Sequence, residues 1–185
     1  MLQKYSGSDQ YTRQYNSPLG TILLACDNEG LIGLWFEGQK YFASILDKTA
    51  AKKDSALFKE PIRWLDMYFA GKNPGFTPPL HFLGTAFQKD VWRLLLAIPY
   101  GETVTYGDIA MELTREKNLS HVSARAIGGA VARNTISIIV PCHRVVGANG
   151  SLTGYAGGID KKRALLAFEK PVVAVRTHGC TRVTS

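Results

Sequence analysis

The residues best suited to chemistry lie together in the segment Pro141-Cys142-His143-Arg144. Cys142 follows the apolar run 136–140, and a cysteine reacts as its thiolate, which neighbouring cations or a general base favour. His143 is placed to act as that base, directly or through a water. Most free cysteines are small buried hydrophobic residues, but these neighbours favour a nucleophile.

A histidine that acts as a base is usually oriented by a carboxylate. The residue types alone leave Asp108, Asp160 and Glu169 open for this role. The other cysteines are Cys26 and Cys180, and an odd number of cysteines is not a disulfide framework. This usage is typical of the reducing cytoplasm.

The first part of the chain predicts antiparallel strands and one helix. Residues 21–26 and 31–36 are apolar runs around Asn28-Glu29-Gly30, which predicts a β-hairpin. An earlier strand is predicted over 11–15, with a turn at Ser17-Pro18-Leu19-Gly20. Apolar residues at helical spacing predict a helix over 57–69, with Pro61 in its first turn.

The second part predicts mainly helices. An apolar stripe from Phe87 to Ile98 predicts one helix. Thr105 is a suitable cap for a short helix over 107–113, and residues 120–123 open another, which together predict a helix-turn-helix. The run 136–140 predicts a buried strand, and the last helix is predicted over 161–168.

These elements predict an α+β fold. The expected organisation is a small N-terminal domain with an antiparallel sheet and a helix, followed by a mainly helical C-terminal domain. The predicted boundaries are 1–75 for the N-terminal domain, 76–84 for a linker, 85–170 for the DNA-binding and catalytic domain, and 171–185 for a flexible tail.

The charge of the chain is concentrated in its second part. Residues 1–80 hold 9 Lys and Arg against 8 Asp and Glu, whereas residues 81–185 hold 13 against 7. A basic second part indicates a polyanionic partner such as nucleic acid. No apolar run reaches the ~18 residues that a membrane span needs, and the first 15 residues lack a secretory core, so the prediction is a cytoplasmic protein.

Several stretches of the sequence resemble one protein family. Pro141-Cys142-His143-Arg144-Val145-Val146 is similar to the signature of the O6-alkylguanine-DNA alkyltransferases, also called methylated-DNA–protein-cysteine methyltransferases. Further similar segments are 17–20, 98–106, 125–130, 151–158 and 165–169, together with Asn134. The resemblance spans roughly residues 10–170.

The resemblance implies direct DNA repair by a single irreversible transfer of the alkyl group from O6-alkylguanine to Cys142. Repair of O4-alkylthymine is left open. The target base is expected to flip out of the duplex, because its O6 substituent cannot be reached inside the stack. His143 is expected to deprotonate Cys142 through a water, and Glu169, rather than Asp108 or Asp160, to orient His143.

Other roles also come from the resemblance. Tyr106 is expected to rotate the nucleotide and hydrogen-bond the guanine, Arg125 to fill the space left in the stack, and Asn134 to tie the recognition helix to the active-site turn. The expected DNA-contacting residues are Tyr106, Arg125, Ala126 and Gly129, and the expected pocket residues are Val145, Tyr155, Ala156 and Gly157. The expected partner is double-stranded DNA containing alkylated bases, bound by a monomer that needs no cofactor.

Two features of the chain differ from the family pattern. The separation between Tyr106 and Arg125 is long, so residues 112–119 are expected to extend the first helix or the turn. Some family members bind zinc in the N-terminal domain, and here Cys26 and His81 are the candidate ligands. Two ligands do not make a tetrahedral site, so no metal is predicted.

Three other functions are disfavoured. Alkyltransferase-like proteins only bind damage and lack the acceptor cysteine, which is present here as Cys142. A cysteine hydrolase using Cys142, His143 and Glu169 fits poorly with an adjacent cysteine and histidine. A sequence-specific transcription factor fits poorly with a second helix rich in Gly and Ala, which offers few side chains to base edges.

Overall fold

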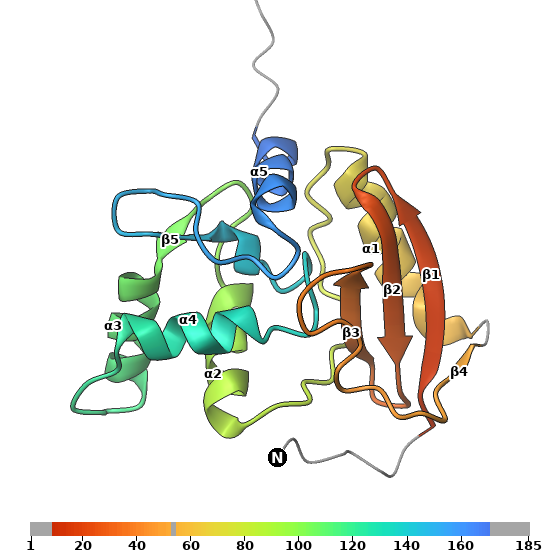
Figure 1. Cartoon of the computed structure of the whole chain (residues 1–185), viewed down its shortest axis with the longest axis horizontal. Coiled ribbons are helices and arrows are strands. Elements are labelled where there is room, and N and C mark those ends of the chain that lie inside the picture. Colours follow the sequence, from red (N-terminus) through yellow and green to blue (C-terminus); the bar gives the residue numbers. More distant parts are fainter. Residues whose placement is uncertain (1–8, 53–54, 171–185) are drawn as a thin grey trace, which may run out of the picture.

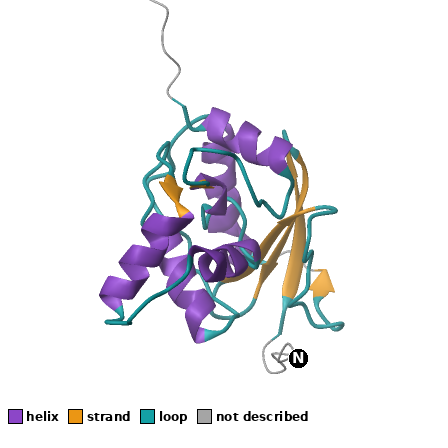
Figure 2. Cartoon of the chain, turned by 60° about the vertical axis from the view of Figure 1, so that its left-hand side comes forward, coloured by secondary structure: helices purple, strands orange, loops and turns teal. Residues whose placement is uncertain are grey.

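A four-stranded sheet forms one side of the molecule and helices form the other (Figure 1). The computed structural model describes residues 9–52 and 55–170. Turning the molecule shows the sheet nearly edge-on, with most of the helices on one side of it (Figure 2). The strand order is β3-β2-β1-β4, with the strands β1 (Tyr11–Ser17), β2 (Gly20–Cys26), β3 (Leu31–Phe36) and β4 (Ala51–Lys52).

The strands and turn predicted for the first part of the chain are confirmed. β2 pairs antiparallel with both β1 and β3, whereas β4, which was not predicted, joins β1 in parallel. Ser17 pairs with Gly20 across the turn, and its hydroxyl donates to the Gly20 carbonyl at 2.6 Å. Gly20 has a φ of +108°, which side chains disfavour.

The N-terminal helix packs against β1 through aromatic residues. The predicted helix over 57–69 begins as a 3₁₀ turn, η1 (Ala56–Phe58), and continues as α1 (Lys59–Phe69). Tyr15 stacks on Phe69 with ring centroids 6.3 Å apart, and its hydroxyl donates to Asp66 at 2.9 Å. These contacts fix α1 on the sheet.

The C-terminal part is mainly helical, as predicted. Threonine side chains at 85 and 105 cap two of its helices with capping boxes, and Ser123 caps a third. The Trp92 indole donates to the Ala130 carbonyl at 3.0 Å and so joins two of the helices. The elements are α2 (Ala86–Leu96), β5 (Val104–Thr105), α3 (Tyr106–Glu116), α4 (Ala124–Ala132), η2 (Cys142–Arg144), β6 (Val145–Val146) and α5 (Ile159–Phe168).

The helix-turn-helix is formed by α3 and α4, and the extra residues at 112–119 lengthen α3. The helix predicted over 107–113 runs on to Glu116. Asn118, with a φ of +50°, then reverses the chain, a conformation that asparagine tolerates better than most residues. The last helix begins at Ile159, two residues before the prediction.

The strand predicted over residues 136–140 is wrong. Only Ile136 makes a β-bridge, to Leu34, and the following residues form a buried turn in which Ile138 has a φ of +68°. A short apolar run indicates burial but does not distinguish a strand from another buried conformation. Here the Asn134 side chain satisfies backbone groups of the turn in place of a neighbouring strand.

The edge strand β3 joins the sheet to this turn. The Leu34 amide donates to the Thr135 carbonyl at 2.8 Å, and the Ser137 amide donates to the Leu34 carbonyl at 2.9 Å. A continuous apolar core extends through both parts of the chain. The sheet therefore supports the segment that leads directly to Cys142. Among the described residues, no helix has the length and apolar character needed to cross a bilayer.

Candidate active site

Cys142 begins the short helix η2 and is almost fully buried, with 4% of its surface exposed. The Asn134 amide lies 3.1 Å from Sγ and also donates to the Val140 carbonyl at 2.9 Å. Through these contacts the Asn134 side chain joins the end of α4 to the turn that carries the thiol. Burial raises the pKa of Cys142 to about 11, although the Asn134 amide and the charge of Lys162 lower it.

His143 and Glu169 form a buried pair behind the thiol. His143 Nε2 lies 2.6 Å from Glu169 Oε1, and neither side chain is exposed. Glu169 is the C-cap of α5. The other two carboxylates left open by the sequence have different partners, since Asp108 binds Thr105 and Asp160 binds Arg163.

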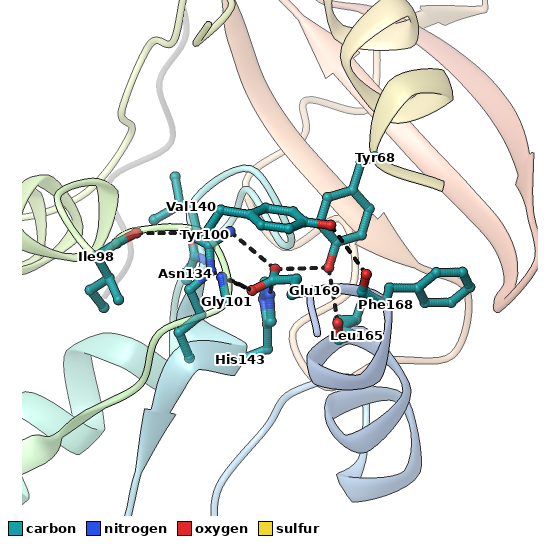
Figure 3. Close-up of polar contacts among 11 residues, drawn as sticks. Tyr68, Ile98, Tyr100, Gly101, Asn134, Val140, His143, Leu165, Phe168 and Glu169 are labelled. Atoms are coloured by element: carbon teal, nitrogen blue, oxygen red, sulfur yellow. Dashed lines mark hydrogen bonds and ion pairs between the residues drawn. The ribbon is translucent and has the colours of Figure 1, made fainter. Parts of the chain in front are cut away.

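The Glu169 carboxylate receives hydrogen bonds from several directions (Figure 3). Arg144 donates from Nε to Oε2 at 2.8 Å and from Nη2 to Oε1 at 3.0 Å. The Tyr68 hydroxyl donates at 2.9 Å and the Gly101 amide at 3.1 Å. Burial alone would raise the pKa of Glu169, but the hydrogen bonds and charges of His143 and Arg144 lower it to about 2.

An ionised Glu169 fixes the tautomer of His143. The ring donates from Nε2, which leaves Nδ1 as a proton acceptor. Nδ1 is buried and has no hydrogen-bond partner among the described residues. Burial lowers the pKa of His143, although Glu169 raises it. The neutral ring therefore has a free nitrogen that can accept a proton.

Lys162 is a fully buried cation that sequence reasoning missed. Its ammonium group donates to the Val145 carbonyl at 2.6 Å and to the Thr153 carbonyl at 2.7 Å. Burial lowers its pKa, and the nearby Cys142 raises it. The signal was its spacing, because Lys162, Leu165 and Glu169 share one face of the last helix and all three are buried.

Arg144 and Tyr68 are two further residues of the site whose roles the sequence did not indicate. Arg144 was noted only as a cation beside Cys142, yet its side chain also donates to the Ile98 carbonyl at 2.6 Å. Tyr68 belongs to α1, so one of the hydrogen-bond donors to Glu169 comes from the N-terminal part of the chain. No local pattern around Tyr68 distinguishes it from a packed aromatic residue.

A loop over residues 147–158 joins β6 to α5 and contacts Tyr106 and Lys162 through the Thr153 carbonyl. The Tyr106 hydroxyl, at the start of α3, donates to the Thr153 carbonyl at 3.2 Å. Tyr106 also lies against α4, because a Cβ added to Gly128 would be 3.9 Å from its ring. Tyr106 is thus placed between the recognition helix and the loop.

The predicted pocket residues come from two neighbouring segments, β6 and the loop that follows it. Val145 is buried on β6, whereas Tyr155, Ala156 and Gly157 belong to the loop. The hydroxyl of Tyr155 is buried. The Ala156 carbonyl accepts a hydrogen bond from the Lys40 amide at 3.0 Å, so the N-terminal part also holds the loop.

The recognition helix α4 presents its predicted DNA-contacting residues to solvent. Arg125, Ala126 and Gly129 are all exposed. The Ala126 amide binds the capping Ser123 side chain at 3.2 Å. A Cβ on Gly129 would meet nothing within 4 Å, so this stretch of α4 is open to close approach by a partner.

The two residues considered as zinc ligands have other partners. His81 Nδ1 lies 2.6 Å from Asp27, and the Cys26 thiol faces the Leu57 carbonyl at 3.8 Å. Within residues 9–52 and 55–170, no three His, Cys, Asp or Glu side chains are grouped as metal ligands would be. Cys180 and the predicted tail lie outside the described residues.

A buried cysteine with a histidine–glutamate pair, next to a helix-turn-helix, defines a class of protein that acts on DNA through a cysteine. Residues 11–82 match the ribonuclease-like domain of 6-O-methylguanine DNA methyltransferase, and residues 86–171 match its DNA binding domain. The chain belongs to the 6-O-methylguanine DNA methyltransferase family. The predicted domain boundaries themselves stay a prediction.

Individual relatives agree with this assignment. The methylated-DNA–protein-cysteine methyltransferase of Methanosarcina acetivorans is 47% identical over 86% of this chain and 97% of its own length. The Mycobacterium tuberculosis OGT in complex with DNA is 43% identical, with a TM-score of 0.76 over 86% of this chain and 92% of that one. The Methanococcus jannaschii O6-methylguanine DNA methyltransferase is 27% identical, with a TM-score of 0.59 over 94% and 99%.

The Glu169 network predicts a specific acid sensitivity of the fold. Glu169 has a pKa of about 2 in the folded protein, below the ordinary value of 4.5. The ionised carboxylate therefore makes its full contribution to the free energy of unfolding above pH 4.5, and this contribution is lost as the pH falls towards 2. Urea titrations should show the difference in unfolding free energy between the unaltered chain and Glu169→Gln shrinking over this window, by up to ~3 kcal/mol.

Asp160→Asn provides the control, since Asp160 is an exposed carboxylate on the same helix. This variant should follow the unaltered chain at every pH. A Glu169→Gln deficit that stays constant from pH 7 to pH 2 would show that the ionised carboxylate does not stabilise the fold.

Proposed function

We propose that this chain repairs DNA directly by moving the alkyl group of O6-alkylguanine onto Cys142. The observation that carries the proposal is the buried Cys142, with the His143–Glu169 pair behind it and a helix-turn-helix beside it. Relatives at 42–47% identity are methylated-DNA–protein-cysteine methyltransferases, and one similar structure is a complex with DNA. As a member of this family, the chain acts in DNA repair by alkyl transfer.

In the proposed reaction the resting thiol is neutral and is activated only at the transfer step. The raised pKa of Cys142, about 11, keeps the thiol protonated at neutral pH. Its proton passes through a water to His143 Nδ1, and Glu169 stabilises the imidazolium that forms. The sulfur then attacks the alkyl carbon and the carbon–O6 bond breaks. Its bonding electrons pass to the guanine, which takes up the proton that His143 had accepted and leaves as the unmodified base.

The roles of Tyr106 and Arg125 in base flipping are part of the proposal. A guanine stacked in the duplex cannot present its O6 substituent to a buried sulfur, so it must leave the stack. Tyr106 lies beside α4 and the loop, which suits rotation of the nucleotide. Arg125 is exposed in the first turn of α4, which suits insertion into the space that the base leaves.

The remaining predicted residues have supporting roles. Asn134 holds Cys142 against the end of α4, and Ala126 and Gly129 allow close approach of the duplex. Inside the pocket, the Val145 carbonyl and the Ala156 amide are expected to read the base edge, with Tyr155 and Gly157 closing over it. Lys162 fixes the Val145 carbonyl and the loop in place.

The product of the reaction is a thioether, which the residues of this site have no means to cleave. Each molecule therefore acts once and requires no cofactor. We propose that it acts as a monomer, since sequence-independent recognition of a duplex needs only one basic surface. We also propose that it acts in the cytoplasm.

The mass of the intact protein tests the proposed function. After incubation with a duplex containing O6-methylguanine, the chain should gain the mass of one methylene group, located on Cys142, and the gain should saturate at one per molecule. Cys142→Ser should gain nothing. Release of methanol with turnover, or an unchanged mass of the unaltered chain, would sink the proposal.

Arg125→Ala tests the flipping role separately. Loss of the inserted side chain should slow repair of the duplex by about 10- to 100-fold, because unstacking costs a few kcal/mol. The reaction with free O6-benzylguanine, which needs no flipping, should be nearly unchanged. Stopped assays of both reactions give the two rates.

Arg163→Ala is the matched control, since it removes an exposed arginine from α5 rather than from the recognition helix. It should leave both rates near those of the unaltered chain. Equal losses on duplex and free base in Arg125→Ala would refute the finger role.

A further inference from the structure

A buried polar cluster joins Tyr155, which lies near Cys142, to two side chains to which the proposed transfer step assigns no role. It consists of Gln39 from the loop after β3, Ser137 from the turn before Cys142, and Tyr155 from the loop over residues 147–158. Gln39 and Ser137 are 7% and 1% exposed. Two of the three side chains carry buried polar atoms without a hydrogen-bond partner among the described residues.

The orientation of the Gln39 amide is fixed by its neighbours. Its Oε1 accepts from the Phe36 amide at 2.9 Å and faces the Ser137 hydroxyl at 3.4 Å. Since the Phe36 N–H can only donate, the oxygen must lie on that side. Nε2 therefore points away from β3, and its N–H groups are buried without an acceptor.

The Tyr155 hydroxyl is a second unused donor in the same region. Ser137 lies close enough to lower the pKa of Tyr155, but no hydrogen bond of normal geometry satisfies the tyrosine hydroxyl. Burial raises the pKa of Tyr155 and the nearby Cys142 raises it further, so the hydroxyl stays protonated. The Lys40–Ala156 backbone hydrogen bond and the contact of Gly157 with Phe36 hold this loop against the Gln39 segment.

Buried donors in folded proteins nearly always have an acceptor. We infer that the substrate supplies the missing acceptor when it enters the site beside the reacting sulfur. The part of the substrate that lies nearest to Cys142 is the alkyl group itself. An O6-alkyl group of two carbons that ends in an oxygen would supply the hydrogen-bond acceptor that these N–H and O–H groups lack.

We propose that Gln39 and Tyr155 form a hydrogen-bonding subsite for the O6-alkyl group, selecting chains with an oxygen acceptor near their end over apolar chains of equal length. The inference rests on the proposed alkyl transfer to Cys142. It makes the N-terminal part of the chain a determinant of substrate choice. A site with buried donors disfavours an analogue that leaves them unpaired.

The test compares two isosteric substrates in one protein. Duplexes carrying O6-(2-hydroxyethyl)guanine or O6-propylguanine are reacted with excess protein, and the ratio of their single-turnover rate constants is measured. The unaltered chain should prefer the hydroxyethyl group. Gln39→Met, which is similar in size but has no donor, should lower the ratio by about tenfold, the contribution of one hydrogen bond.

The ratio cancels a general loss of folded protein, because both substrates meet the same sample. Tyr155→Phe should also lower it and serves as the second variant if Gln39→Met does not fold. Thr135→Val is the control, since it removes another unpartnered buried hydroxyl from the turn that holds Ser137, and it should leave the ratio unchanged.

Two failures are distinguishable. If the unaltered chain does not react with O6-methylguanine either, the proposed function is wrong. If it transfers methyl groups normally but shows no hydroxyethyl preference, or keeps that preference in Gln39→Met and Tyr155→Phe, the subsite is wrong and the alkyl transfer stands.

Discussion

The buried carboxylate of Glu169 is the constraint on which the rest of the site depends. An ionised group away from water is tolerated only when charges and hydrogen bonds compensate it, and here His143, Arg144, Tyr68 and the Gly101 amide all do so. These donors come from α1, from the segment after α2, and from η2. One anion at the end of α5 therefore holds together segments far apart in the sequence.

The two parts of the chain are coupled at the site rather than merely connected by a linker. Tyr68 binds Glu169 from the N-terminal side, and Leu34 on the edge of the sheet pairs with the turn before Cys142. On α5, Lys162 fixes the loop over the pocket while Glu169 fixes His143. The apolar core alone would permit small shifts in these elements, but the buried polar contacts specify their positions.

The neighbours of Cys142 in the sequence predicted that it is a nucleophile, whereas Glu169 was chosen only through the family resemblance, because a carboxylate at a helix end is usually exposed. It missed Lys162, whose partners are backbone carbonyls that no residue pattern reveals. It also took residues 136–140 for a strand, since an apolar run reports burial and not backbone conformation. The helices and their threonine and serine caps were predictable because caps and periodicity are local.

The central claim is that Glu169 orients His143 so that Nδ1 can take the proton of a thiol that is neutral at rest. The most direct measurement is the single-turnover rate of methyl transfer from duplex O6-methylguanine in Glu169→Gln and the unaltered chain, from pH 7 to pH 10. We expect the variant to be about 100-fold slower at pH 7, because His143 without the ionised carboxylate is no longer held as an effective general base, and a general base contributes at least about 100-fold. The deficit should narrow as hydroxide deprotonates Cys142 at high pH. An equal deficit at every pH, or none at all, would contradict the claim.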